Sequence, residues 1–234
     1  MSTFVFVSGA WLGSWCWKRM TPFLMNQSVY CPTLTGLGER SHLTDHEINL
    51  STHIQDVVNL IIYEELNDVV LVGHSYAGFV ITGVADQLPK RIKHLVYLDA
   101  NVPQGNEAFF DAWSENGRNI VYTEAKAAGT PRFWPLPKDV VDLFNPSDQG
   151  LMKSKATAHP IGTFEEALIY NQENWESLPK TYILCEDGRQ QFPPYVENAK
   201  SSSEWGFTSI ETHHWPMISK PKELAMIFNQ IENY

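Results

Sequence analysis

The sequence DVVLVGHSYAG, residues 68–78, joins a strand pattern to the start of a helix pattern. After Asp68, its next four residues form a short apolar run, which is typical of a strand buried on both faces. Small residues, Gly73 and Ala77, stand two positions before and two positions after Ser75, and Gly78 follows. This spacing allows a sharp turn that exposes a serine hydroxyl at a strand end, although glycine is usual where Ala77 stands. The stretch therefore predicts Ser75 as a nucleophile; the alternative is that Ser75 only caps the helix.

The chain on either side of this stretch has the alternating strands and helices of a parallel sheet. We expect strands at residues 3–7, 29–31, 68–72, 94–98, 181–185 and 207–211, and helices at residues 51–62, 76–88 and 221–231. Ser51 and Thr52 are the expected N-cap of the first helix. Right-handed crossovers place such helices on both faces of the sheet, and chemistry is usually found at the carboxyl ends of the strands. The polar residues that follow predicted strands are Ser8, Ser75, Asp99, Asp187 and His214.

Residues 103–178 differ in composition from the rest of the chain. They are rich in Trp, Phe, Pro and Asn and contain no strong strand pattern. We interpret them as an inserted, mostly helical cap. The core is then made of residues 1–102 and 179–234.

Composition and charge limit the classes of partner. The 234 residues include 17 Lys and Arg against 27 Asp and Glu, a net charge of −10, which argues against a nucleic-acid partner. The three cysteines, Cys16, Cys31 and Cys185, are widely spaced and predict buried free thiols in a reducing cytoplasm. The N-terminus is typical of a core strand rather than a signal peptide, and no apolar run is long enough to span a bilayer. A homodimer is left open.

A serine hydroxyl needs an adjacent base to act as a nucleophile. His214 follows the last predicted strand and precedes the last helix, with His213 as its neighbour and rival. Three further histidines, His42, His46 and His53, could in principle form a metal site, but solvated or structural roles are favoured. Because no convincing metal-ligand spacing and no phosphate-binding loop are found, we expect neither a metal nor a cofactor.

Several longer stretches resemble one family. FVFVSGAWLGSWCWKRMTPFL is similar to the opening of small cap-bearing α/β-hydrolases, which include plant methyl esterases and hydroxynitrile lyases. CPTLTGLGERSHL, LVGHSYAG and LVYLDANVP resemble bacterial esterase-like members more closely, and HWPMISKPKELA resembles the ending around their catalytic histidine. The resemblance implies an α/β-hydrolase fold, with a mostly parallel sheet of about six strands, helices on both faces and an inserted cap. It also implies His214 rather than His213, since the family's histidine is followed by x-x-Met and then Ser-Lys-Pro.

The same resemblance implies an oxyanion hole made of two backbone N–H groups. By position these belong to Ala10, after the first strand, and Tyr76, after the nucleophile. One departure is that Ser8 stands where the family usually has histidine, which puts the geometry of this loop or the substrate pocket in doubt.

The expected catalytic triad joins the serine and the histidine to an acidic residue, and the sequence determines this acid least. In the plant members it lies a few residues after the strand at 181–185, where this chain has Gln190. Asp187 or Glu186 could substitute if the loop is shorter, whereas Asp99 ends the strand that follows the nucleophile helix. We favour Asp99 over Asp187; its alternative interpretation is a loop cap at a strand end.

Ester hydrolysis through an acyl-enzyme on a small, largely apolar substrate is the leading functional prediction. Aromatic residues of the cap are expected to line the pocket, or else to pack within the cap: Phe109, Phe110, Trp113, Phe133, Trp134 and Trp175. A hydroxynitrile lyase is the first alternative, weakened because Trp215 replaces the lysine that those enzymes have after the histidine. A non-catalytic ligand-binding relative is the second, favoured by Gln190 and Ser8. Haloalkane dehalogenation is excluded because it needs a carboxylate nucleophile.

Overall fold

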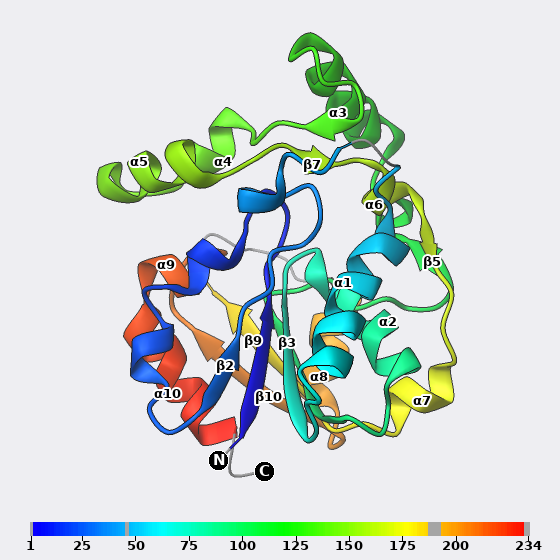
Figure 1. Cartoon of the computed structure of the whole chain (residues 1–234), viewed down its shortest axis with the longest axis vertical. Coiled ribbons are helices and arrows are strands. Elements are labelled where there is room, and N and C mark those ends of the chain that lie inside the picture. Colours follow the sequence, from blue (N-terminus) through cyan, green and yellow to red (C-terminus); the bar gives the residue numbers. More distant parts are fainter. Residues whose placement is uncertain (1, 45–46, 187–192, 232–234) are drawn as a thin grey trace.

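A single six-stranded sheet forms the centre of the computed structural model, which describes residues 2–44, 47–186 and 193–231. The strand order is β10-β9-β4-β3-β1-β2, and every neighbouring pair is parallel (Figure 1). The strands are β1 (Thr3–Val7), β2 (Ser28–Tyr30), β3 (Val69–His74), β4 (Ile92–Leu98), β9 (Lys180–Cys185) and β10 (Trp205–Ile210). The predicted sheet is confirmed, with β4 beginning two residues earlier than expected.

Helices cover both faces of this sheet, which explains the continuous apolar strand patterns. Successive side chains of a strand point to opposite faces. Val5 and Val7 of β1 belong to one core, with α1 (Leu50–Tyr63), α2 (Ala77–Gln87) and α8 (Pro194–Ser201). Phe4 and Phe6 belong to a second core, with the short helices η1 (Ser14–Trp17), α9 (Pro216–Ser219) and the closing helix α10 (Pro221–Ile231). The remaining short helices of this region are η2 (Thr21–Phe23) and η3 (Gly38–Arg40).

The N-cap of α1 is not the one expected from the sequence. Asn49 caps the helix by accepting the N–H of Thr52 at 3.0 Å, while the Asn49 N–H donates to the Thr52 hydroxyl at 3.4 Å. Ser51 instead donates its hydroxyl to Glu166 at 2.9 Å. The prediction was wrong because α1 begins one residue before Ser51 and because Ser51 is used in a contact with the segment 103–178.

The segment between β4 and β9 leaves the sheet and returns to it. Its elements are β5 (Glu107–Ala108), η4 (Phe109–Ala112), α3 (Glu115–Ala127), β6 (Phe133–Trp134), α4 (Lys138–Asp142), α5 (Pro146–Lys155), β7 (His159–Pro160), α6 (Gly162–Glu165), β8 (Ala167–Leu168) and α7 (Gln172–Glu176). Helices α3, α4 and α5 lie beyond the carboxyl ends of the strands (Figure 1). Helix α7 packs against α2 at the opposite end. The part of this segment that covers the carboxyl edge therefore excludes α7.

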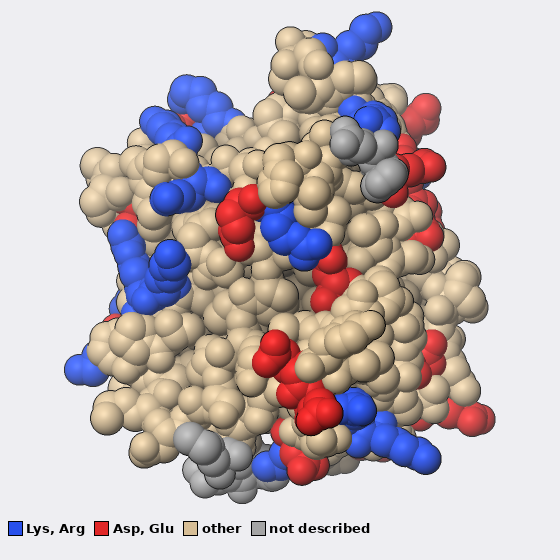
Figure 2. All heavy atoms as spheres, viewed as in Figure 1, with Lys and Arg blue, Asp and Glu red and all other residues tan. Residues whose placement is uncertain are grey.

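Charge is unevenly distributed over the molecular surface. In the view of Figure 2, Lys and Arg side chains gather at the left, over α5 and α9, and Asp and Glu side chains lie mainly toward the centre and right. Among the residues described, no helix has the length and apolar character needed to cross a bilayer. None of the three cysteines forms a disulfide. Cys16 and Cys185 are buried, as expected, whereas Cys31 is half-buried, and burial raises its pKa to about 12.

Candidate active site

Ser75 lies in a sharp turn between β3 and α2. Its φ is +56°, a left-handed conformation that is uncommon for residues other than glycine. A Cβ atom on Gly73 would lie 2.7 Å from the carbonyl oxygen of Ala77, and one on Gly78 would lie 1.9 Å from that of Asn101. Both glycines are therefore required by close backbone approach. The Ser75 N–H donates to Leu98 at 3.3 Å, which ties the turn to the end of β4.

Asp99 follows β4 directly and joins three parts of the sheet edge. Its N–H donates to the carbonyl of Ile183 at 2.7 Å, and its Oδ1 accepts the N–H of Cys185 at 3.3 Å. Its Oδ2 lies 2.5 Å from Nδ1 of His214. The Asp99 side chain is fully buried, whereas 26% of the His214 side chain is exposed. Because the carboxylate is an acceptor, the geometry assigns the proton to Nδ1 of His214 and leaves its Nε2 as the acceptor nitrogen.

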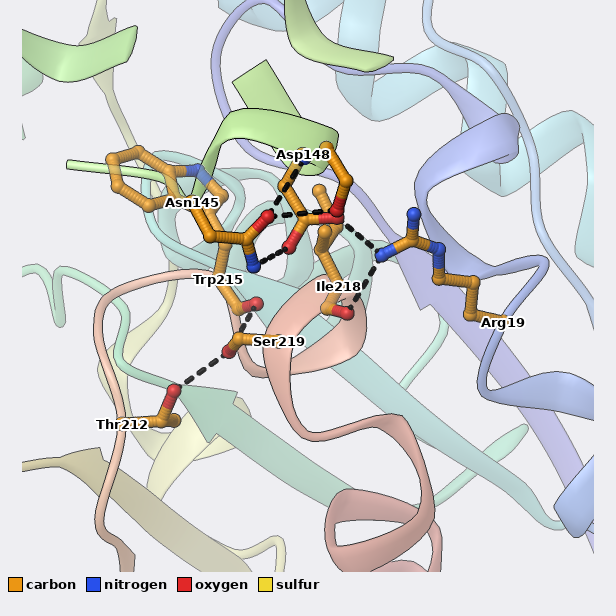
Figure 3. Close-up of polar contacts among 8 residues, drawn as sticks. Arg19, Asn145, Asp148, Thr212, Trp215, Ile218 and Ser219 are labelled. Carbon is orange, nitrogen blue, oxygen red and sulfur yellow. Dashed lines mark hydrogen bonds and ion pairs between the residues drawn. The ribbon is translucent and has the colours of Figure 1, made fainter. Parts of the chain in front are cut away.

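The loop that carries His214 is held from several sides. His74, in the last position of β3, donates from Nε2 to the backbone carbonyl of His214 at 2.7 Å. The hydroxyl of Ser219 lies 2.6 Å from that of Thr212 and donates to the carbonyl of Trp215 at 3.1 Å (Figure 3). The rival His213 is exposed. Of the two histidines, His214 is the one that the structure brings to a buried carboxylate.

The loop after β1 lies against Ser75. A Cβ atom on Gly9 would lie 2.8 Å from the Cβ of Ser75, so Ala10, the next residue, is close to the serine turn. Ser8, by contrast, accepts hydrogen bonds from the indole N–H of Trp17 at 3.3 Å and the thiol of Cys16 at 3.7 Å. Ser8, which stands where the family usually has histidine, therefore connects the loop after β1 to η1.

A buried network around the Tyr76 side chain was missed by the sequence analysis, which used only its backbone. Nδ1 of His53 lies 3.1 Å from the Tyr76 hydroxyl, and Nε2 of His53 donates to the carbonyl of Thr35 at 2.9 Å. The Tyr76 hydroxyl is thus the donor to His53. Burial lowers the pKa of His53 to about 4. Its position on the apolar face of α1, among Ile54 and Val57, is the signal in the sequence that could have shown its burial.

The histidines considered as a metal site do not share one environment. His53 is buried in α1, whereas His42 is exposed and contacts the carbonyl of Glu39 at 3.2 Å. His46 lies outside the described residues. Within the ranges described, no group of three or more His, Cys, Asp and Glu side chains is arranged to hold a metal ion.

Four of the six aromatic residues expected in the pocket form one cluster beside the Ser75 turn. They are Phe109, Phe110, Trp113 and Trp134, and they pack around Phe164. Ring centroids of Phe109 and Phe164 lie 5.6 Å and 5.3 Å from that of Tyr76. Trp175 does not belong to this cluster, and its expected place in the pocket was wrong: its indole N–H donates to Tyr97 at 2.8 Å, because α7 packs at the far end of the sheet. Phe133 lines a separate surface groove with Tyr122 and Arg132.

Of the two alternative acids, Glu186 lies within the described residues and Asp187 does not. Asp187 lies outside the described residues, as does Gln190. Glu186, the last described residue before them, is exposed, and its N–H donates to the carbonyl of Ile210 at 3.1 Å.

Comparison with known proteins agrees with this architecture. A model of the alpha/beta hydrolase family matches residues 4–227. The carbendazim hydrolyzing esterase of Nocardioides sp. (strain SG-4G) is 50% identical over 236 residues, covering 96% of this chain and 97% of that protein. Methylesterase 3 of Arabidopsis thaliana is 26% identical and covers 98% and 95%.

Solved structures show the same fold. An extracellular alpha/beta-hydrolase from a Paenibacillus species superposes with a TM-score of 0.85 at 24% identity, covering 98% of each chain. At this identity the likeness concerns the fold alone. The family match spans nearly the whole sequence, and the Nocardioides enzyme shares half of the aligned residues. The chain is therefore a member of the alpha/beta hydrolase family.

Proposed function

We propose that this protein hydrolyses a small, largely apolar carboxylic ester through an acyl-enzyme on Ser75. It is a carboxylic ester hydrolase, as its 50% identical relative is an esterase and methylesterases are among its other relatives. The observation that carries the proposed mechanism is the 2.5 Å contact between Asp99 Oδ2 and His214 Nδ1 at the edge where the strained Ser75 turn lies. A buried carboxylate in this position both orients the imidazole and stabilises its positive charge.

In the proposed reaction, Nε2 of His214 takes the Ser75 proton as the serine oxygen attacks the ester carbonyl. The negative charge on the carbonyl oxygen is met by the backbone N–H groups of Ala10 and Tyr76. His214 then gives its proton to the leaving alcohol, and the acyl group stays on Ser75. A water molecule, deprotonated by the same histidine, then attacks the acyl-enzyme carbonyl. The bond between the acyl carbon and the serine oxygen breaks, His214 returns the proton to that oxygen, and the acid leaves.

The surroundings of this site support an apolar substrate. The aromatic cluster centred on Phe164 contacts Tyr76, the residue after the proposed nucleophile. The residue after His214 also argues against the hydroxynitrile lyase alternative. Trp215 is buried, with its ring centroid 4.6 Å from that of Phe144, so this position provides an apolar contact and no cation for cyanide.

The test is an ester panel run on the wild type and on Ser75→Ala. It should contain p-nitrophenyl esters of increasing chain length, methyl aryl esters, a lactone, a thioester and carbendazim, the compound in the name of the 50% identical relative. We expect turnover of at least one oxygen ester by the wild type, with its loss in Ser75→Ala. A fluorophosphonate probe should label the Ser75 peptide, as read by mass spectrometry. Binding of these compounds with no turnover would support the non-catalytic alternative.

A further inference from the structure

Arg19 connects the cap to the helix that follows His214. Its Nη1 donates to Oδ1 of Asp148 in α5 at 2.6 Å and to the backbone carbonyl of Ile218 in α9 at 3.1 Å (Figure 3). These partners lie 129 and 199 residues from Arg19 in the chain. One guanidinium nitrogen therefore bridges two helices, α5 and α9, that lie far apart in the sequence.

The cap end of this bridge is a buried carboxylate with a complete set of partners. Only 4% of the Asp148 side chain is exposed, against 43% of that of Arg19. Oδ2 of Asp148 accepts the side-chain N–H of Asn145 at 2.7 Å, and the Asp148 N–H donates to the Asn145 side-chain oxygen at 3.0 Å. A buried carboxylate is costly without a cation, so α5 is held in its present place by Arg19.

The core end of the bridge lies in the loop that carries His214. Ile218 is four residues after His214 and belongs to α9. Trp215, directly after the histidine, packs its ring against Phe144, just before α5, with centroids 4.6 Å apart. The cap segment around α5 thus contacts the His214 loop twice, once through this aromatic pair and once through Arg19.

We propose that Arg19 is a positioning residue that couples the seating of α5 to the placement of His214. The inference rests on the proposed function, because it assigns His214 the role of base. Seating α5 through Asp148 holds Arg19 against the Ile218 carbonyl, which fixes the short helix α9 and with it the histidine loop that precedes it. Release of α5 then shifts His214 relative to Ser75, and displacement of a catalytic group by about 1 Å can cost roughly 100-fold in rate.

The kinetic test compares Arg19→Gln with Arg19→Lys and with Lys138→Gln. The last is a matched control, since it removes the same charge in the neighbouring α4, where Lys138 pairs with Asp142 of its own helix and with no other acid among the described residues. Arg19→Gln should lower kcat about 10- to 100-fold for both short and long p-nitrophenyl esters, with a smaller change in KM. Arg19→Lys, which can donate to both acceptors, should recover much of kcat, and Lys138→Gln should resemble the wild type. A change confined to KM or to long esters would overturn the proposal.

Hydrogen exchange provides a measurement that does not depend on activity. Arg19→Gln should speed amide exchange in α5 and in residues 215–220 together, because one bond network holds both. Faster exchange in α5 alone would show an anchored cap without coupling and would overturn the proposal. If the wild type turns over no ester of the panel, the proposed function fails, while this exchange result still decides whether the two segments are coupled.

A second variant tests the proposal if Arg19→Gln fails to fold. Misfolding is a risk there because Arg19→Gln leaves the Asp148 carboxylate buried without its cation. Arg19→Met combined with Asp148→Asn removes both charges and retains the packing of the arginine stem. It also lacks the donor to Ile218, so we expect the same loss of kcat and the same joint exchange change. Wild-type kcat in this double variant would contradict the proposal.

Discussion

Asp99 and His214 lie 115 residues apart in the chain, yet Oδ2 of Asp99 and Nδ1 of His214 are 2.5 Å apart. Asp99 follows β4 and His214 follows β10, and β9 lies between these strands in the sheet. The Asp99 carboxylate therefore reaches past the end of β9, where its other oxygen accepts the N–H of Cys185. The contact therefore depends on the order of three strands rather than on any local pattern.

Replacing Asp99 with asparagine should lower kcat for ester hydrolysis by roughly 10³- to 10⁴-fold, because the amide cannot stabilise the imidazolium and favours the wrong tautomer. The matched control is Glu186→Gln, at an exposed acid beside the same sheet edge, which should cost little. Steady-state kinetics on a p-nitrophenyl ester measure both. Equal losses in the two variants would show that Asp99 is not the acid of the triad.

Ser75→Ala and His214→Ala should each lower turnover by roughly three orders of magnitude or more, since nucleophile and base act as one unit. His213→Ala should retain most activity because its side chain is exposed and only His214 of the pair contacts the buried Asp99 carboxylate. Should His213→Ala prove as damaging as expected for His214→Ala, the assignment of the base would be reversed.

Gly78→Ala should lower the free energy of unfolding by about 3 kcal/mol or more, because the added methyl would lie 1.9 Å from the backbone carbonyl of Asn101. The neighbouring change Ala77→Gly removes a methyl instead and should cost about 1 kcal/mol, close to the helix propensity difference. Urea unfolding of the two variants measures the contrast. Similar stabilities would mean that the turn can relax around a Cβ at position 78.

Stability should fall on acidification through the window from about pH 6.5 to pH 4, because burial lowers the pKa of His53 to about 4. In this window the unfolded chain binds a proton that the folded chain does not, so the free energy of unfolding decreases as pH falls. His94, with a pKa also lowered to about 4 by burial, adds to the effect. Melting temperatures at several pH values should show a shallower slope for His53→Gln and an unchanged slope for His42→Gln, the exposed control. An unchanged slope in His53→Gln would contradict the assignment.

Extensive treatment with a chelator should leave esterase activity unchanged, since the proposed steps use only Ser75, His214, Asp99 and backbone N–H groups. The measurement is the rate on one ester before and after dialysis against a chelator, with zinc added back. Loss of activity that zinc restores would reveal a metal requirement that the proposed mechanism does not contain.

The sequence by itself determined the sheet and the serine turn, because both depend on neighbouring residues. Continuous apolar runs predict strands buried on both faces, and the six strands match these runs closely. The Ser75 turn was predictable because small residues flank the serine within one stretch, where Gly73 is required by its close approach to the Ala77 carbonyl; the contact of Gly78 with Asn101 comes from a distant segment. His214 was chosen over His213 through the resemblance of the residues that follow it.

Only the tertiary structure decided which side chains meet across the molecule. It brought Asp99 to His214, joined His53 to Tyr76, and placed Arg19 between Asp148 and Ile218. It also places Trp175 at the far end of the sheet, whereas the sequence led us to expect this residue in the pocket. Such contacts depend on strand order and on how a long insertion folds back over the core, and neither is encoded in the local periodicity of apolar residues.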